Sequence, residues 1–429
     1  MWEDTQKRRK ILNVFLVILI LIVVAGIAYF GLQLHEQTAA HDKELSEVYV
    51  QQQQQQAEAR QESLTVVDGE YEKDLKTVAE YLPGIVCWGD NTTAAVSGLL
   101  NFPYVLQTYI NTYLCDIYDL SSSIENATDY SRLDWKKYKI NIPVVNMAAG
   151  KESTYTVMGR AGVDPYIVSK EFTIPAEAEP VGISFTSSEG MVVTPLTGGD
   201  AGVNNVFIAG IEGKLSLNQE SYNNYGTLSY SFTRLTPGSE VVVPPGTVIK
   251  TASEDLYHNY IHVIFVGMYG DYTNADDLVR QVKILLERQT QNSDRYIVLG
   301  PYTHNIYTTS SSATEAVDNA MLAAFGSRYI SIRKYLIGDG YIDAGKTPTN
   351  DDKFYIAQEI VPPTFKVSSN SEELNSLAHR LIGKLIYTRM DNLGYFDEIK
   401  EELYLTETTK QILKEDPQYF ESIINNILK

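Results

Sequence analysis

Short apolar runs that alternate with helix-forming stretches constrain the fold of this chain most strongly. The runs read as buried strands and cover residues 85–88, 141–145, 262–267 and 295–300. The helix-forming stretches cover residues 71–82, 94–120, 275–288, 311–325 and 374–390, with Pro103 as an expected interruption of the second. Strands that alternate with helices of this length predict an α/β fold, in which a parallel sheet carries crossover helices on both faces.

The alternation stops between residues 171 and 251. β-rich runs there are separated by turn residues such as Gly198-Gly199 and Pro244-Pro245-Gly246. The runs cover residues 181–186, 191–196, 206–211, 227–233 and 240–249. We therefore predict an antiparallel β domain inserted between two strands of the parallel sheet.

The N-terminal sequence predicts a membrane anchor. Four basic residues, 7–10, precede residues 11–30, a run of 20 residues whose only strongly polar side chain is Asn13. A helix of this length spans the roughly 30 Å of the hydrocarbon core, and the basic cluster places its N-terminal side in the cytoplasm. A cleaved signal peptide is the alternative interpretation. Its apolar core would be shorter, and Thr38-Ala39-Ala40 lies far from the end of this run, so an uncleaved anchor is favoured.

The segment after the anchor is polar and contains six consecutive glutamines, Gln51–Gln56. It has no proline or glycine, which favours a helical stalk, and a disordered spacer is the alternative. The predicted organisation is thus a cytoplasmic segment (1–10), a transmembrane helix (11–34), a stalk or linker (35–68), an α/β domain (69–170 and 252–392), the inserted β domain (171–251) and a helical tail (393–429).

Charge and cysteine content limit the possible partners. A net charge of −19 repels phosphates, which excludes nucleic acid and suits a protein that faces solvent, cations or cell-wall material. The two cysteines, Cys87 and Cys115, either form a disulfide or remain separate thiols. The sequence has no metal-ligand spacing and no phosphate-binding glycine loop, so we predict no cofactor and no metal. Its 30 tyrosines suit contacts with sugars or interfaces.

The segment with the clearest functional signal follows the first strand. Trp88-Gly89-Asp90-Asn91 lies at the carboxyl end of that strand, where α/β folds commonly present a nucleophile. It resembles block I of the SGNH/GDSL hydrolases, which reads Gly-Asp-Ser, with Asn91 in place of the serine. Residues 144–162, 264–272 and 370–373 resemble blocks II, III and V of the same family, in the same order.

The resemblance covers roughly residues 70–392 and implies an SGNH-like (flavodoxin-like) parallel sheet, as in large bacterial members that carry a β insertion. It places the nucleophile position at Asn91, the oxyanion positions at Ala148 and Tyr269, and the aspartate and histidine positions at Asn370 and Glu373. The family has serine, glycine, asparagine, aspartate and histidine at these five positions. Every catalytic side chain is therefore altered. Ala148 is the mildest change, because its backbone N–H could still serve an oxyanion.

These replacements predict a pseudoenzyme. Acyl transfer by this route needs a hydroxyl nucleophile and an imidazole that takes its proton, and a carboxamide at position 91 offers no useful proton. In a comparable triad, loss of the serine or the histidine lowers turnover by about 10⁶-fold. The missing oxyanion donor would cost about 10²- to 10³-fold more. A rebuilt site that uses Thr92 or Thr93 as the nucleophile is the alternative.

The candidate binding residues also have structural interpretations. Asn91 suits a loop or helix cap, Asp90 suits binding of backbone amides, and Glu373 suits the first turn of a helix. Tyr269 would either fill the old cleft or stack on a sugar, and Thr92 offers a hydroxyl beside them.

Three functions compete at this point. The first is a membrane-anchored surface protein that binds envelope carbohydrate or a cell-surface protein, with the inserted β domain and the helical tail (396–429) as candidate partner surfaces. The second is an active esterase or O-acyltransferase with a rebuilt site. The third is a structural member of a membrane complex.

Overall fold

The computed structural model of the protein describes residues 82, 84–95, 100–114, 142–150, 153–190, 203–218, 229–254, 257–269, 272–289, 295–302, 311–369, 371, 373–398, 414–416 and 418–428. All of them belong to the unit Glu62–Lys429. The predicted anchor and stalk, together with Cys115 and Asn370, lie outside these residues. No helix within the described ranges combines the length and the apolar character needed to cross a membrane.

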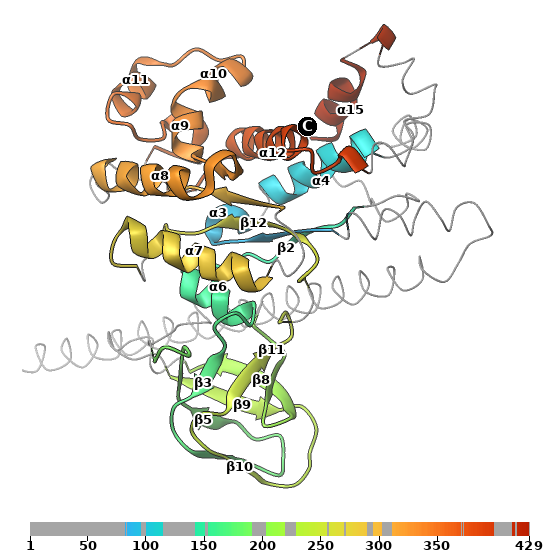
Figure 1. Ribbon diagram of the computed structural model, residues 1–429, viewed down its shortest axis with the longest axis vertical. Helices are drawn as coiled ribbons and strands as arrows, with labels where there is room; N and C mark the ends of the chain where they lie inside the picture. Colours follow the sequence, from blue (N-terminus) through green and yellow to red (C-terminus); the bar gives the residue numbers. More distant parts are fainter. Residues whose placement is uncertain are drawn as a thin grey trace, which may run out of the picture. The chain divides into compact units, whose positions relative to one another are not determined.

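Five parallel strands form one sheet, shown at the centre of Figure 1. Their spatial order is β2 (Val144–Asn146), β1 (Ile85–Trp88), β12 (Ile261–Phe265), β13 (Tyr296–Leu299) and β14 (Tyr329–Ile330). Numbered along the chain, these strands lie in the order 2-1-3-4-5. The direction of winding therefore reverses between β1 and β12. The predicted parallel sheet is confirmed, and β14 is an additional strand of only two residues.

Helices cover both faces of this sheet, as predicted. Side chains of β1 alternate between two cores, with Ile85 and Cys87 in one and Val86 and Trp88 in the other. The first core also contains residues of α4 (Phe102–Leu114) and α12 (Ser376–Asn392), whereas the second contains residues of α6 (Thr154–Arg160), α7 (Ala275–Gln289) and α8 (Ser311–Phe325). Burial on both faces explains why the strands read as continuous apolar runs.

One helix differs from its prediction. Pro103 does not interrupt a helix over 94–120, because it lies in the first turn of α4. A proline there removes an N–H that would have no partner within the helix, so it starts the helix without cost. Apart from the C-terminal helix α15 (Tyr419–Ile427), the remaining described helices are short: α3 (Asn91–Ala94), α9 (Ile332–Ile337), α10 (Asp339–Asp343), α11 (Asn350–Ile356), and the 3₁₀ turns Gly326–Arg328 and Pro363–Phe365.

The strands between α6 and β12 are antiparallel, as predicted for the inserted domain. They are β3 (Tyr166–Val168), β4 (Phe172–Ile174), β5 (Val181–Ile183), β6 (Phe185–Thr186), β7 (Val206–Ile208), β8 (Ile211–Leu217), β9 (Tyr230–Arg234), β10 (Val241–Val243) and β11 (Val248–Thr251). Seven of them form a sheet in the order β5-β9-β8-β7-β11-β3-β6, and β10 pairs with β4. Its two outer strands, β5 and β6, are separated only by Ser184, so the sheet curls back on itself.

The predicted start of this insertion, residue 171, is wrong by five residues. β3 begins at Tyr166 and pairs with β11 and β6, so it belongs to the antiparallel sheet. The sequence did not indicate this boundary, because Tyr166–Val168 reads equally well as a strand of either sheet. The side chain of Tyr166 is fully buried beside the ring of Phe185, with the ring centroids 5.6 Å apart.

The C-terminal helix α15 (Tyr419–Ile427) packs against α4. Phe420 and Ile424 are fully buried in the same core as α4 and α12. Lys384 of α12 forms an ion pair with Glu421 at 3.0 Å. The apolar face of this part of the tail is thus covered by the chain itself, whereas the tail was predicted as a docking surface for a partner.

Candidate functional site

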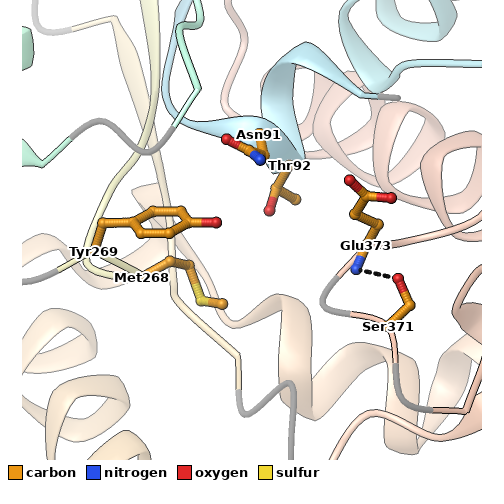
Figure 2. Close-up of a pocket in the computed structure, with 6 residues that line it drawn as sticks. All are labelled: Asn91, Thr92, Met268, Tyr269, Ser371 and Glu373. Atoms are coloured by element: carbon orange, nitrogen blue, oxygen red, sulfur yellow. Dashed lines mark hydrogen bonds between the residues drawn. The ribbon is translucent and has the colours of Figure 1, made fainter. Parts of the chain in front are cut away.

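A pocket of about 240 Å³ lies at the carboxyl ends of β1 and β12. Six residues from the short helix α3 and two loops line it: Asn91, Thr92, Met268, Tyr269, Ser371 and Glu373 (Figure 2). β1 and β12 are the two strands between which the winding of the sheet reverses, and open α/β sheets bind ligands at that point. Four of the predicted site residues, drawn from the segments that resemble blocks I, III and V, therefore meet at one pocket.

Asp90 holds the loop that presents Asn91 and Thr92. It is fully buried and caps α3, with its carboxylate accepting a hydrogen bond from the backbone N–H of Thr92 at 2.8 Å. Its backbone carbonyl accepts from the N–H groups of Thr93 and Ala94, both at 3.0 Å. The prediction that Asp90 binds backbone amides is therefore confirmed. Its side chain does not line the pocket.

Tyr302 contacts two of the residues that line the pocket, and its role was not predicted from the sequence. Its phenol oxygen lies 3.2 Å from the hydroxyl oxygen of Thr92, and its backbone N–H donates to the sulfur of Met268 at 3.3 Å. The Tyr302 ring is buried and stacks on Phe265, with the centroids 6.2 Å apart. Its position just after β13, at the same edge of the sheet as residues 91 and 269, was the signal available in the sequence.

Ala148, the predicted oxyanion position, does not line the pocket. Its backbone N–H donates to the side-chain oxygen of Asn146 at 3.1 Å, so this amide is already engaged within its own turn. The side-chain nitrogen of Asn146 in turn donates to the carbonyl of Thr93 at 3.1 Å. Gly150, in the same segment, lies against Asn91, since a Cβ atom there would lie 3.1 Å from Asn91 Oδ1.

Glu373 lies before the last long helix rather than in its first turn. The helix α12 begins at Ser376 and its N-cap is Asn375, whose side chain accepts from the N–H of Ala378. The prediction that Glu373 is a helix N-terminal carboxylate is therefore wrong. Its backbone N–H donates to the hydroxyl of Ser371 at 2.9 Å (Figure 2). The Glu373 carboxylate makes no hydrogen bond and no ion pair with the described part of the chain.

The loop that carries Glu373 is anchored by Asn375. The side-chain nitrogen of Asn375 donates to the carbonyls of Thr364 and Lys366, at 2.9 and 3.0 Å. Its backbone N–H donates to the carbonyl of Phe365 at 3.0 Å. These bonds hold both ends of the loop, because residues 364–366 precede it and residue 375 follows it. They fix where Ser371 and Glu373 enter the pocket.

Among the described histidines, none lines the pocket. His262 is fully buried in β12, where its Nδ1 accepts from the indole N–H of Trp88 at 3.2 Å and its Nε2 lies 3.1 Å from the carbonyl oxygen of Tyr257. These contacts fit the neutral ring with its proton on Nε2, and burial lowers the pKa of His262 to about 3. His379 of α12 is stacked on Phe102, and burial lowers its pKa to about 4. His304 lies outside the described residues.

The chemistry of the pocket is that of hydrogen bonding. Its lining offers an amide, two hydroxyls, a phenol, a thioether and a carboxylate. In the described ranges, no group of histidine, cysteine, aspartate and glutamate side chains could hold a metal ion. Comparison with known proteins found no matching family model, no matching curated protein and no matching solved structure.

Proposed function

We propose that this protein is a membrane-anchored, extracytoplasmic SGNH hydrolase-like pseudoenzyme that binds carbohydrate of the cell envelope through its pocket. The observation that carries the proposal is the meeting of Asn91, Tyr269 and Glu373 at one pocket. These residues come from three distant segments, and the family resemblance assigned all three to the catalytic site. The strand order 2-1-3-4-5 supports the proposal, because flavodoxin-like folds have that order. The anchor rests on the basic and apolar residues of segment 7–30.

The loss of catalysis follows from the lining of the pocket. A carboxamide occupies the nucleophile position, and a carboxylate occupies the histidine position. The amide of Ala148, which the family would use for the oxyanion, is engaged by Asn146. The described part of the pocket therefore offers no imidazole to activate a hydroxyl, which acyl transfer by this route requires.

The binding of carbohydrate rests on the same groups. Amide, hydroxyl and carboxylate side chains exchange hydrogen bonds with sugar hydroxyls, and they converge here from different loops. The ring of Tyr269 extends along one side of the pocket with its hydroxyl directed inward (Figure 2). An aromatic ring in this position offers a flat apolar surface to a sugar.

Ester hydrolysis tests the proposal. The full-length protein is compared with a variant that carries Asn91→Ser, Asn370→Asp and Glu373→His, with short aryl esters and acetylated glycans as substrates. We expect no hydrolysis by the natural protein and measurable hydrolysis by the variant. Hydrolysis by the natural protein that is lost in Thr92→Ala would overturn the assignment as a pseudoenzyme.

An active esterase with a rebuilt site is the second candidate, and one observation favours it. The hydroxyls of Thr92 and Ser371 line the same pocket as the Glu373 carboxylate, which is able to act as a base. This candidate predicts a covalent adduct with a serine-directed phosphonate, located by peptide mapping at residue 92 or 371. Absence of labelling under conditions that label an active esterase would exclude it.

A further inference from the structure

We infer that the pocket selects a cationic hydroxylated ligand, namely a single amino-sugar ring with a free ammonium group. The inference rests on the proposed function, because it names the class of carbohydrate that the same pocket takes. Its starting point is the charge of the lining. Glu373 supplies the only formal charge among the six lining residues, and its carboxylate has no counter-ion in the described part of the chain.

A half-buried carboxylate without a counter-ion favours a cation over a neutral group. The surrounding protein lowers the local dielectric constant, so the attraction between the carboxylate and an ammonium group is stronger than in bulk water. An ammonium–carboxylate hydrogen bond is also stronger than one between neutral groups. No lysine or arginine lines the described pocket, so nothing there favours an anionic ligand.

The opposite side of the pocket is also suited to a cation. Tyr269 and Met268 lie across from Glu373 and Ser371 (Figure 2). The hydroxyl oxygen of Tyr269 is directed into the pocket and can accept a hydrogen bond from an ammonium group, and the thioether sulfur of Met268 is polarizable. A ligand that places its ammonium group near Glu373 therefore faces neutral, electron-rich groups across the pocket and no positive charge.

The neutral polar groups and the volume define the rest of the ligand. Asn91, Thr92 and Ser371 provide donors and acceptors for hydroxyl groups. The volume of about 240 Å³ is below the roughly 300 Å³ at which pockets for drug-sized ligands begin. One sugar ring therefore suits the pocket better than an oligosaccharide does.

Calorimetric titration of the full-length protein tests this inference with four monosaccharides: glucosamine, glucose, N-acetylglucosamine and glucuronic acid. We expect glucosamine to bind about tenfold more tightly than glucose or N-acetylglucosamine. We expect glucuronic acid to bind most weakly, because its carboxylate is repelled. The Glu373→Gln variant keeps the size of the side chain and should bind glucosamine and glucose equally. The control Glu240→Gln removes the same charge from an exposed position of the β domain and should keep the preference.

The outcomes separate this inference from the proposed function. Equal binding of glucosamine and glucose by the natural protein overturns the inference and leaves a carbohydrate-binding pocket. A preference for glucosamine that persists in Glu373→Gln also overturns the inference, because the carboxylate is then not needed for the preference. Circular dichroism establishes that the variant is folded. If the natural protein binds none of the four sugars, the proposed carbohydrate-binding function fails together with the inference.

Discussion

The hydroxyl of Thr92 and the phenol of Tyr302 lie 3.2 Å apart, and this contact joins α3, which follows β1, to the loop after β13. Both side chains are almost completely buried. The wall of the pocket at Thr92 is therefore fixed by a residue that does not itself line the pocket.

Substitution Tyr302→Phe should lower the free energy of unfolding by about 1 to 3 kcal/mol, because it leaves the buried Thr92 hydroxyl without this partner. Urea denaturation measures the effect. In a double-mutant cycle, the combined Tyr302→Phe and Thr92→Val variant should lose less than the sum of the two single variants. Strict additivity would mean that the two groups do not interact.

Stability should fall at acidic pH because of His262 and His379. Burial lowers their pKa values to about 3 and about 4, below the value of about 6.5 in an unfolded chain. The unfolded state therefore binds these protons more readily. The contribution of each histidine is complete above about pH 7 and is lost as the pH falls from about 6.5 toward its folded pKa. Each should lower the free energy of unfolding by about 1.4 kcal/mol per pH unit within that window.

The variant His379→Leu isolates the contribution of one of these two histidines to the pH dependence of stability. His379 is buried beside Phe102, and its Nδ1 has no hydrogen-bond partner in the described part of the chain. Leucine should therefore be tolerated at neutral pH. The slope of unfolding free energy against pH, measured by urea denaturation between about pH 6 and about pH 4.5, should become smaller. The decrease should correspond to the uptake of about one proton fewer on unfolding. An unchanged slope would show that His379 does not contribute to the acid sensitivity.

The C-terminal helix should be part of the folded core. Phe420 is fully buried, with its ring centroid 4.9 Å from that of Tyr113. Phe420→Ala should therefore lower the free energy of unfolding by about 3 to 5 kcal/mol. Asn425→Ala, on the exposed side of the same helix, should change it by less than about 0.5 kcal/mol. Similar effects of the two substitutions in thermal or urea unfolding would argue against this packing.

A buried ion pair should stabilise the region that follows β13. The guanidinium of Arg333 is fully buried and donates to Asp318 at 2.7 Å and to Glu359 at 2.5 Å, and Asp318 also accepts from the hydroxyl of Tyr329. Arg333→Met should cost about 3 to 5 kcal/mol, because Asp318 is left buried and charged.

Adding Asp318→Asn to Arg333→Met should recover part of this loss, since it removes the uncompensated charge. Glu359→Gln is the matched comparison. The Glu359 side chain is 46% exposed, so its loss should cost about 1 kcal/mol or less. A loss in Glu359→Gln as large as that in Arg333→Met would contradict the assignment of Asp318 as the essential partner.

Four of the five strands of the parallel sheet and four of the six residues that line the pocket could be predicted from the sequence. Burial on both faces leaves a continuous apolar run, which is a local pattern, and the carboxyl ends of parallel strands necessarily share one edge of the sheet. Asn91 and Tyr269 follow such runs, so their approach was predictable. Whether Asp90 and Glu373 lie at the start of a helix was harder to predict. Asp90 binds a backbone amide at the start of α3, as its structural interpretation expected, whereas Glu373 lies before α12 and not in its first turn.

The contacts between segments that are distant along the chain could not be predicted and became visible in the folded structure. Tyr302 supports Thr92, the amide of Ala148 is engaged by Asn146, and Phe420 returns to the core beside α4. Each depends on which hydrogen bond or packing partner is nearest once the sheet has assembled. A local pattern carries no information about such a partner, because side chains of the same type would read identically whether they were buried or exposed to solvent.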